Sequence, residues 1–319
     1  MTSALRVVAA GGIGMVQDLG RVGMQRFGVP VSGALDSMSL RIANAVVGNA
    51  EGTAGLEMFY QGPTLEIEAD SVRVAAVGAP LEVLAGERRR AVPSGRSVLL
   101  RRGERLAVGA CAGTLVAYLV VEGGFALPDV LGSLSTFARA GFGGMEGRPL
   151  RKGDALPLAL AAAPERPERS APQCDLAPPA RVRIVFGPQD DYFTARGKST
   201  LTQSTYTVST HSDRIGMRLH GPGLEHAKGF DIVSDGTAPG SIQVPGNGLP
   251  IVLLADRPTT GRYPKIATVA SADVPALGRL RPGAQIGFDA ISVEEAEQAR
   301  RELEARIAGL RARLESRLY

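Results

Sequence analysis

The sequence predicts a mainly β protein built from closed or sandwich-like antiparallel domains, with few helices. Three observations lead to this fold class. The 319 residues include 40 glycines and 21 prolines, which is above average usage and indicates many turns. Short segments rich in Val, Leu and Ile recur in both halves and are bounded by Gly, Pro or charged residues. Long helical patterns do not alternate with these segments, which disfavours both a helical bundle and a doubly wound parallel sheet.

One break in composition indicates the domain organisation. Residues 161–180 are rich in Pro and Ala and have no hydrophobic period, which is typical of an extended linker. The length of the chain suits two domains of about 150 residues each. We therefore expect an N-terminal β domain over residues 1–163, a linker over 164–180, a C-terminal β domain over 181–291 and an amphipathic helix over 292–319.

The N-terminal half should contain strands and one helix. Apolar residues recur at helical spacing from Leu35 to Val46, and Gly48 follows them as a stop signal. Strands are expected in this half at residues 71–78, 97–100, 105–108 and 115–121. In the C-terminal half they are expected at residues 182–186, 206–208, 251–255 and 266–270. Because Trp is absent and aromatic residues make up 5% of the chain, the cores should consist of Val, Leu, Ala and Ile.

The last segment has the pattern of an amphipathic helix of about 25 residues. Ser292 and Glu295 form a capping-box pattern at its start. An apolar seam then runs between alternating Glu and Arg residues, at Val293, Ala296, Leu303, Ile307, Leu310 and Leu314. This seam packs either against its own protein or against a partner helix in a homo-oligomer. The sequence leaves both alternatives open.

The composition disfavours several classes of function. The formal net charge is +4 and the basic clusters are not interleaved with aromatic residues, so we expect no nucleic-acid partner. The chain has no run of 18 apolar residues and no signal-type segment, so we expect a soluble, cytoplasmic protein without membrane contact. Two cysteines, Cys111 and Cys174, are too few for a disulfide framework or a zinc site.

Standard catalytic signatures are missing as well. The chain has no GxxxxGKS/T phosphate loop and no GxSxG nucleophile turn. Its three histidines, His211, His220 and His226, lack the spacing of a metal-binding motif, so no metal site is expected. Function must then be sought in polar loops at strand ends and helix starts, where a rigid scaffold meets its ligands.

Two polar stretches of this kind leave their roles open. Asp36 follows a glycine-rich loop and begins a helix, where a carboxylate caps free N–H groups. Its alternative role is to orient a substrate at the mouth of that loop. Asp213 and Arg214 adjoin in a turn, where they form either a local salt bridge or a guanidinium fork for a carboxylate or phosphate.

The third polar stretch is the most informative. Gln243 lies on a short strand that precedes it. The stretch itself follows the next apolar strand and contains Asp256, Arg257, Thr259, Thr260, Tyr263 and Lys265. The ammonium of Lys265 is suited to lie near an anionic or carbonyl oxygen. A solvent-exposed hairpin loop is the alternative, but so many hydrogen-bonding side chains within ten residues favour a ligand site.

These stretches together resemble a known family. The segments that carry the resemblance are VQDLGR, GVPVSGALDSMSLRIAN, YLVVEGGF, LGSLSTFARAGFGGMEGRPLRKGD, SDRIGMRLHGPGL and PGSIQVPGNGLPIVLLADRPTTGRYPKIATVASAD. They are similar to KipA-type proteins, which are also described as subunit 2 of allophanate hydrolase and as the biotin-dependent carboxyltransferase family. The C-type subunit of bacterial 5-oxoprolinase is one of its members. The matches occur in order across nearly all of residues 10–290, whereas the tail after Ser292 is less tied to the family pattern.

The resemblance implies a fold, an activity and partners. It implies a pair of cyclophilin-like β-barrel domains, and a non-autonomous subunit of an ATP-dependent 5-oxoprolinase that opens 5-oxoproline to L-glutamate. The implied partners are two further subunits, a KipI-like one of type B and a LamB/YcsF-like one of type A. ATP would be bound by one of these partners or across an interface, because this chain has no phosphate loop. The chain also lacks a biotin-attachment motif, so no covalently attached biotin is expected.

Two alternatives follow from the same resemblance. One is a biotin-dependent carboxyltransferase that acts on urea or a similar small amide and is served by a separate biotin carrier. The other is a KipA-like regulatory protein that binds and antagonises a KipI-like kinase inhibitor. The proteins encoded by neighbouring genes would distinguish these functions.

The resemblance also implies roles for the polar residues. Lys265, Arg257 and Asp36 are the expected catalytic residues: the two cations would stabilise a carboxyl or phosphoryl group, and Asp36 and Gln243 would orient the substrate amide. The other candidates would line the substrate site, at Asp213, Arg214, Asp256, Thr259, Thr260 and Tyr263. The family pattern has glycine where Arg262 stands. We therefore expect either a different course of this loop or a more anionic ligand.

Overall fold

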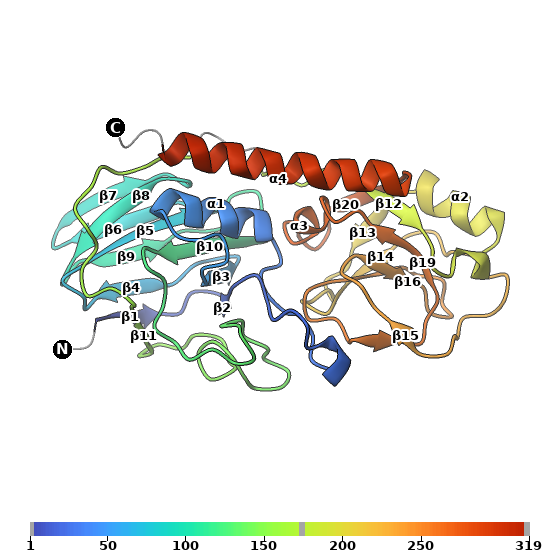
Figure 1. The fold of residues 1–319 in the computed structure, drawn as a ribbon, viewed down its shortest axis with the longest axis horizontal. Coiled ribbons are helices and arrows are strands. Elements are labelled where there is room, and N and C mark those ends of the chain that lie inside the picture. Colours follow the sequence, from blue (N-terminus) through green and yellow to red (C-terminus); the bar gives the residue numbers. More distant parts are fainter. Residues whose placement is uncertain (1–2, 172–175, 316–319) are drawn as a thin grey trace. The chain divides into compact units, whose positions relative to one another are not determined.

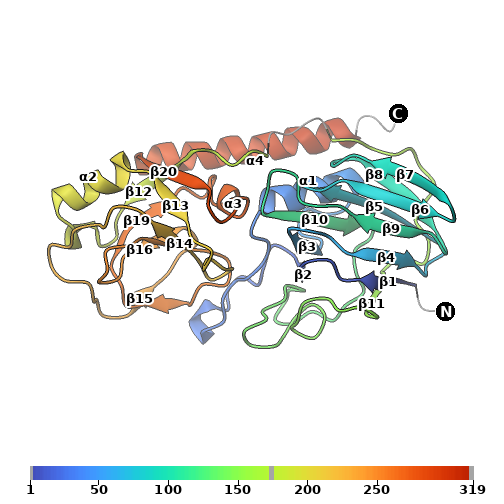
Figure 2. The same cartoon turned by 180° about the vertical axis from the view of Figure 1, so that it is seen from behind.

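The computed structural model describes residues 3–171 and 176–315, so Cys174 lies outside the described residues. These residues form two compact units. The N-terminal unit comprises the described residues of Met1–Arg21, Ser32–Ala177 and Arg306–Tyr319, and the C-terminal unit comprises Val22–Val31 and Pro178–Ala305. Each unit is built mainly from strands (Figure 1 and Figure 2). The expected mainly β fold with few helices and a C-terminal helix is confirmed.

Two antiparallel sheets make up the N-terminal unit (Figure 1). In order across the first sheet, the strands are β11 Ala155–Pro157, β1 Ala4–Ala9, β4 Thr64–Ile67, β9 Arg105–Val108, β6 Leu81–Ala85 and β7 Arg88–Val92. Across the second they are β2 Gly14–Gln17, β3 Gly55–Phe59, β10 Val116–Val121, β5 Ser71–Val77 and β8 Ser97–Arg101. The strands expected in this half correspond to β5, β8, β9 and β10. The exposed arginines of β7 keep the edge of the first sheet charged, which hinders pairing with other chains.

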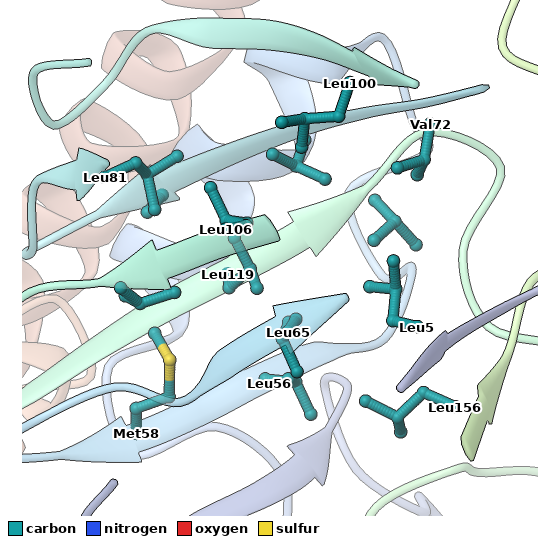
Figure 3. Close-up of a cluster of buried hydrophobic side chains, with 14 of the residues drawn as sticks. Leu5, Leu56, Met58, Leu65, Val72, Leu81, Leu100, Leu106, Leu119 and Leu156 are labelled. Carbon is teal, nitrogen blue, oxygen red and sulfur yellow. The ribbon is translucent and has the colours of Figure 1, made fainter. Parts of the chain in front are cut away.

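The hydrophobic core of the N-terminal unit lies between these two sheets. Leu5, Leu65 and Leu106 extend from the first sheet, and Leu56 and Leu119 extend from the second (Figure 3). All five are fully buried in one cluster that is almost entirely aliphatic, as the absence of Trp predicts. Burial of one leucine side chain contributes about 1.5–3 kcal/mol. Packing between the sheets is therefore a principal source of this unit's stability.

Helix α1, Ser37–Val47, packs against β5 and β10 of the second sheet (Figure 1). Its N-cap is Asp36, whose side chain accepts a hydrogen bond from the backbone N–H of Ser39. Its C-cap is Gly48, with a φ of 77° that glycine adopts at little cost. The helix expected between Leu35 and Gly48 is confirmed.

Part of the segment expected as a linker lies along the N-terminal unit. Arg73 on β5 is fully buried and donates hydrogen bonds to the carbonyl oxygens of Pro164 at 2.9 Å and Arg166 at 3.0 Å. Its guanidinium also pairs with Glu122 at 2.7 Å and Glu168 at 3.3 Å. A buried guanidinium needs such partners, because an unpaired charge away from water is costly. This stretch is therefore held in place by an arginine inside the sheet.

Seven strands of the C-terminal unit close into a barrel (Figure 2). In order around the barrel they are β12 Arg181–Phe186, β19 Lys265–Val269, β16 Ser241–Gln243, β17 Ile251–Leu253, β14 Gly216–His220, β13 Tyr206–Val208 and β20 Gln285–Ala290. Neighbouring strands are antiparallel, except for the parallel pair of β12 and β20. A separate two-stranded ribbon joins β15 Asp235–Gly236 to β18 Thr260–Gly261. The strands expected in this half correspond to β12, β13, β17 and β19.

Short helical segments complete the C-terminal unit. Helix α2, Ala195–Gln203, packs against β20. Helix α3, Val274–Leu277, is a single turn. This unit also contains two 3-10 turns, η1 Gln25–Phe27 and η2 Asp190–Tyr192. No helix within the described residues is long and apolar enough to span a membrane.

The last helix, α4 Val293–Glu315, begins with the expected capping box. The N–H of Ser292 donates to Oε2 of Glu295 at 2.8 Å, and the N–H of Glu295 donates to Oγ of Ser292 at 3.1 Å. Three seam residues in the part of α4 that belongs to the N-terminal unit are buried, namely Ile307, Leu310 and Leu314. Their burial within the chain favours packing against its own protein over a partner helix.

Candidate functional site

The barrel brings together two of the expected residues, Gln243 and Lys265. Gln243 ends β16 and Lys265 begins β19, and the two lie opposite each other in the antiparallel register. An irregularity between Ile242 and Gln243 shifts this register, as a β-bulge does. Such bulges re-aim side chains and are common beside active sites. Both side chains are buried, since 5% of Gln243 and 2% of Lys265 is exposed.

The ammonium of Lys265 is paired with a carboxylate that the sequence analysis did not single out. Its Nζ lies 2.9 Å from Oδ2 of Asp235 on β15. Gln189 links the same two residues, because its Oε1 accepts a hydrogen bond from the N–H of Lys265 and its Nε2 donates to Oδ2 of Asp235. Hydrogen bonds from Lys265, Gly236 and Gln189 lower the pKa of Asp235. Asp235 is half exposed, so the ion pair leads from the buried barrel strand to solvent.

Gly261 on β18 of the ribbon leaves room for the side chain of Gln243, because glycine has no Cβ atom. A Cβ atom at Gly261 would lie 2.2 Å from Nε2 of Gln243, so a larger residue there would displace the amide. Among the described residues, this Nε2 has no hydrogen-bond partner. A buried donor left without a partner costs about 1–3 kcal/mol. The amide is therefore a candidate donor to an oxygen of a bound substrate.

Arg257 is the second buried cation of this region, with 2% of its surface exposed. Its Nε and Nη1 donate to the carbonyl oxygens of Thr237 and Leu254, both at 3.4 Å. No carboxylate in the part of the chain that the structure describes pairs with it. Burial lowers the pKa of Arg257, yet an arginine keeps its charge in a protein. The region thus contains a positive charge that no neighbouring carboxylate neutralises.

Arg214 and Asp256 form a nearly buried ion pair. Nε and Nη2 of Arg214 donate to the two carboxylate oxygens of Asp256 at 2.8 and 3.1 Å, in the bidentate geometry that arginine favours. The pair fixes the start of the polar loop after β17. Asp213 is exposed, and its Oδ1 accepts hydrogen bonds from the N–H groups of Ile215 and Gly216. Asp213 therefore shapes a turn, while its contact with a substrate stays a prediction.

The polar loop is folded back on the ribbon and is not a free hairpin tip. The carbonyl of Thr259 accepts a hydrogen bond from the N–H of Thr237 at 3.1 Å. Thr260 is exposed and pairs with Gly236 across the ribbon. These contacts hold the threonine backbone in place. A lining role for the two hydroxyl groups stays a prediction.

Arg262 and Tyr263 lie at the outer end of this loop. Nε of Arg262 lies 3.3 Å from Oδ1 of Asp231, and its guanidinium lies over the ring of Tyr263, 5.7 Å from the centroid. Arg262 does not adopt a positive φ, so its position does not require glycine. Arg262 thus replaces the glycine of the family pattern without backbone strain, and its exposed guanidinium pairs with Asp231.

Asp36 belongs to the N-terminal unit, where it is almost fully buried. Its two carboxylate oxygens accept hydrogen bonds from the N–H and Oγ–H of Ser39. Its own N–H donates to the hydroxyl of Tyr118 at 2.8 Å, and that hydroxyl donates to Oε2 of the buried Glu57 at 2.5 Å. Burial, with the charges of Glu57 and Asp36, raises the pKa of Tyr118 well above its ordinary value. The geometry supports capping, and substrate orientation by Asp36 stays a prediction.

Sequence reasoning missed several residues that hold the site together. Three of these residues, Asp235, Gln189 and Thr237, lie far in sequence from the residues that they contact. Their segments have no periodic pattern. Only closure of the barrel brings them close to Lys265 and Arg257. Glu57 and Tyr118 lie inside apolar strands, β3 and β10. A carboxylate within a continuously buried strand is unusual unless it is partnered. That signal could have identified Glu57.

In the C-terminal unit, Gln243, Lys265 and Arg257 form a polar cluster near Gly261 and Thr237. A Cβ atom at Gly261 would meet both Nε2 of Gln243 and Cγ2 of Thr237, and the carbonyl of Thr237 accepts from Arg257. Lys265 and Arg257 supply positive charge, and Gln243 supplies an unused N–H. In a site poor in water, such donors stabilise negative charge that develops on a carbonyl oxygen. The cluster therefore suits electrostatic activation of an amide or carboxyl group.

The chain is similar to proteins of known families. A model of the carboxyltransferase domain, subdomain A and B, matches residues 27–290. The C-type subunit of the Haemophilus influenzae 5-oxoprolinase is 38% identical over 292 residues, which is 91% of this chain and 92% of that protein. The C-type subunit of the Escherichia coli 5-oxoprolinase is 37% identical over 298 residues, which is 93% of this chain and 94% of that protein.

A solved structure shows the same fold. The crystal structure of the K. lactis urea amidolyase matches with a TM-score of 0.88 and 30% sequence identity. The match covers 97% of this chain but only 20% of that much longer chain. The family model covers most of this chain and both units. The chain thus belongs to the family of carboxyltransferase domains with subdomains A and B.

Proposed function

We propose that this chain is the C-type subunit of an ATP-dependent 5-oxoprolinase complex, which opens 5-oxoproline to L-glutamate. The observation that carries the proposal is the match to two 5-oxoprolinase C-type subunits across more than nine-tenths of both sequences in each pair. The name of those relatives implies an assembly of several subunits. We propose a KipI-like protein of type B and a LamB/YcsF-like protein of type A as the partners, with ATP bound by one of them or at an interface.

The polar cluster supports a part in activating the lactam. Attack on an amide moves negative charge onto the carbonyl oxygen, and this step is favoured by donors that are already in place. Gln243 offers its unpartnered Nε2–H to that oxygen. Lys265 and Arg257 supply the positive charge that an oxyanion or a phosphoryl group needs. Asp235 and Gln189 fix the position of the Lys265 ammonium, so little reorganisation is required.

Reconstitution of the complex tests this function. The chain would be purified together with candidate KipI-like and LamB/YcsF-like proteins from the same source, and ADP release would be measured with and without 5-oxoproline. We expect release that depends on 5-oxoproline and requires all three proteins. An intact three-protein complex without such release would overturn the proposal. Omission of this chain alone is the matched control.

A second function, carboxyl transfer to urea or a similar small amide, is favoured by the similarity to the urea amidolyase structure over nearly all of this chain. It would need a separate biotin carrier, because this chain has no biotin-attachment motif. Urea-dependent consumption of carboxybiotin from an added carrier, without turnover of 5-oxoproline, would select this alternative.

A further inference from the structure

The C-terminal unit contains a polar pocket that shares no residue with the candidate site. Its volume is about 500 Å³, which lies in the range of sites for small molecules. Its polar lining consists of Ser209, His211, Arg218, His220 and Asn247. The pocket lies on β14 and β17 of the barrel and on the loops that flank these strands.

The strand β14 places the cationic residues of this pocket. Arg218 and His220 are two residues apart and are exposed, whereas Met217 and Leu219 are buried. Side chains two residues apart point to the same face of a strand. In the register of the barrel, Arg218 lies opposite Ile251 on β17. The guanidinium and the imidazole are therefore presented on the outer face of the barrel, beside an apolar neighbour.

The two imidazoles converge on one buried hydroxyl. Oγ of Ser209 lies 3.0 Å from Nε2 of His220 and 3.5 Å from Nδ1 of His211. The same oxygen accepts a hydrogen bond from the backbone N–H of His211 at 3.2 Å. The N–H of Ser209 donates to the carbonyl of Arg218, which ties this turn to β14. The ring of His220 is thus held by the hydroxyl of Ser209, and the ring of His211 lies beside the same hydroxyl.

The pocket has donors but no carboxylate in its lining. The guanidinium of Arg218 makes no ion pair or hydrogen bond with the described residues, in contrast to the paired Arg214. Oδ1 of Asn247 accepts the N–H of Leu249 at 3.1 Å, which leaves the NH2 group of that amide as the part able to donate. A guanidinium without a carboxylate partner favours an oxyanion as ligand.

Part of the pocket wall is apolar and is formed by Leu249, Pro250 and Ile251. A free inorganic anion would gain nothing from this wall, whereas each buried CH2 group of an organic ligand contributes about 0.8 kcal/mol. We propose that this pocket binds a small organic carboxylate, with its oxyanion on Arg218 and Asn247 and its apolar body on Leu249 and Ile251. The two imidazoles flank the carboxylate.

Histidine NMR resonances of the full-length chain test the proposal. The chain has three histidines, and His226 lies outside the pocket, against the ring of Phe193. Cyclopentanecarboxylate, acetate and inorganic phosphate would be titrated separately. We expect saturable shifts of the His211 and His220 ring signals with cyclopentanecarboxylate, and none for His226. Acetate should bind about fivefold or more weakly, because it lacks the ring methylenes.

Two arginine variants make the test specific. Arg218→Gln should weaken binding of cyclopentanecarboxylate about tenfold or more, since it removes a charge-assisted hydrogen bond. Arg196→Gln, on the exposed surface of α2, should leave the affinity unchanged. The proposal is overturned if neither pocket histidine shifts, if the Arg218 variant binds as the parent does, or if phosphate binds more tightly than both carboxylates.

Discussion

Gln243 and Lys265 lie directly opposite each other across β16 and β19, yet only one of the two side chains has a polar partner among the described residues. The ammonium of Lys265 is fixed by Asp235 at 2.9 Å, whereas Nε2 of Gln243 is buried without a partner. Lys265 therefore supplies a positive charge that Asp235 holds in position, and Gln243 supplies a hydrogen-bond donor. This difference is the basis of our proposal that the Nε2–H of Gln243 donates to a substrate oxygen near the charge of Lys265.

Lys265→Met should abolish most of the activity while the chain stays folded. The ammonium is lost from a site where one preorganised donor is worth about 100-fold to 1,000-fold in rate. The partner left behind, Asp235, is half exposed and can be solvated, so the cost in stability should be small. ADP release by the reconstituted complex measures the effect. Lys198→Met, which breaks the ion pair with Asp190 on the surface, is the control and should retain full activity.

Gly261→Ala should lower the activity of the complex while leaving the stability of the chain nearly unchanged. The new Cβ would lie 2.2 Å from Nε2 of Gln243, and the end of that flexible side chain would have to move. We expect the melting temperature to change little but ADP release to fall about tenfold or more, because the donor is displaced. Gly236→Ala is the matched control, since Gly236 lies in the same ribbon and a Cβ there meets nothing within 4 Å. Equal activity of the two variants would remove Gln243 from the site.

Local patterns were sufficient to predict much of the fold. The apolar spacing before Gly48 predicted α1, and the capping box at Ser292 predicted the start of α4, because helix ends are determined by nearby residues. Short apolar runs between turn residues predicted the strands. These features depend on residues that are close to one another in the sequence.

The partners within the site could not be predicted in this way. Asp235 reaches Lys265 only because β15 pairs with β18 and β16 pairs with β19, and no local pattern encodes such long-range registers. The shift of register at Gln243 is likewise a property of the closed barrel. Arg73 carries a charge within a continuously buried strand, and its partners in residues 164–171 became visible only in the fold.

Two buried tyrosines should respond differently to loss of the hydroxyl. Tyr118→Phe removes a partner from both the N–H of Asp36 and the carboxylate of Glu57, so it should destabilise the chain by about 1–3 kcal/mol. Tyr206→Phe should be neutral or slightly stabilising, because the hydroxyl of Tyr206 has no hydrogen-bond partner in the described residues. Urea unfolding of the two variants measures the difference. Equal destabilisation by both would contradict the assigned networks.

Tyr206 should also contribute to loss of stability at high pH. Burial raises its pKa to about 12, above the value near 10 of an exposed tyrosine. Since the folded state binds this proton more tightly, the contribution to stability is complete below pH 10 and is lost as the pH rises to about 12. Urea midpoints of the parent should therefore fall more steeply over this range than those of Tyr206→Phe. Parallel curves would show that Tyr206 does not titrate differently in the two states.

Arg73→Met should release residues 164–171 from the N-terminal unit. The substitution removes the donor to the carbonyls of Pro164 and Arg166 and leaves the carboxylates of Glu122 and Glu168 without that partner. Breaking a buried ion pair on one side costs about 3–5 kcal/mol. We expect trypsin to cut the variant rapidly within this stretch, at concentrations that leave the parent intact, with the sites identified by mass spectrometry.

The control for this release is a second arginine that contacts the same stretch from the surface. Arg101 pairs with Glu165 at 3.1 Å, but both side chains are largely exposed. Exposed pairs contribute about 0–1 kcal/mol, so Arg101→Met should leave the rate of cleavage near that of the parent. If both variants were cut at the same rate, the buried guanidinium would not be what holds the stretch. Protection of Arg101→Met alone would assign that role to Arg73, whose guanidinium bonds to the carbonyl oxygens of Pro164 and Arg166 and pairs with Glu168 in this segment.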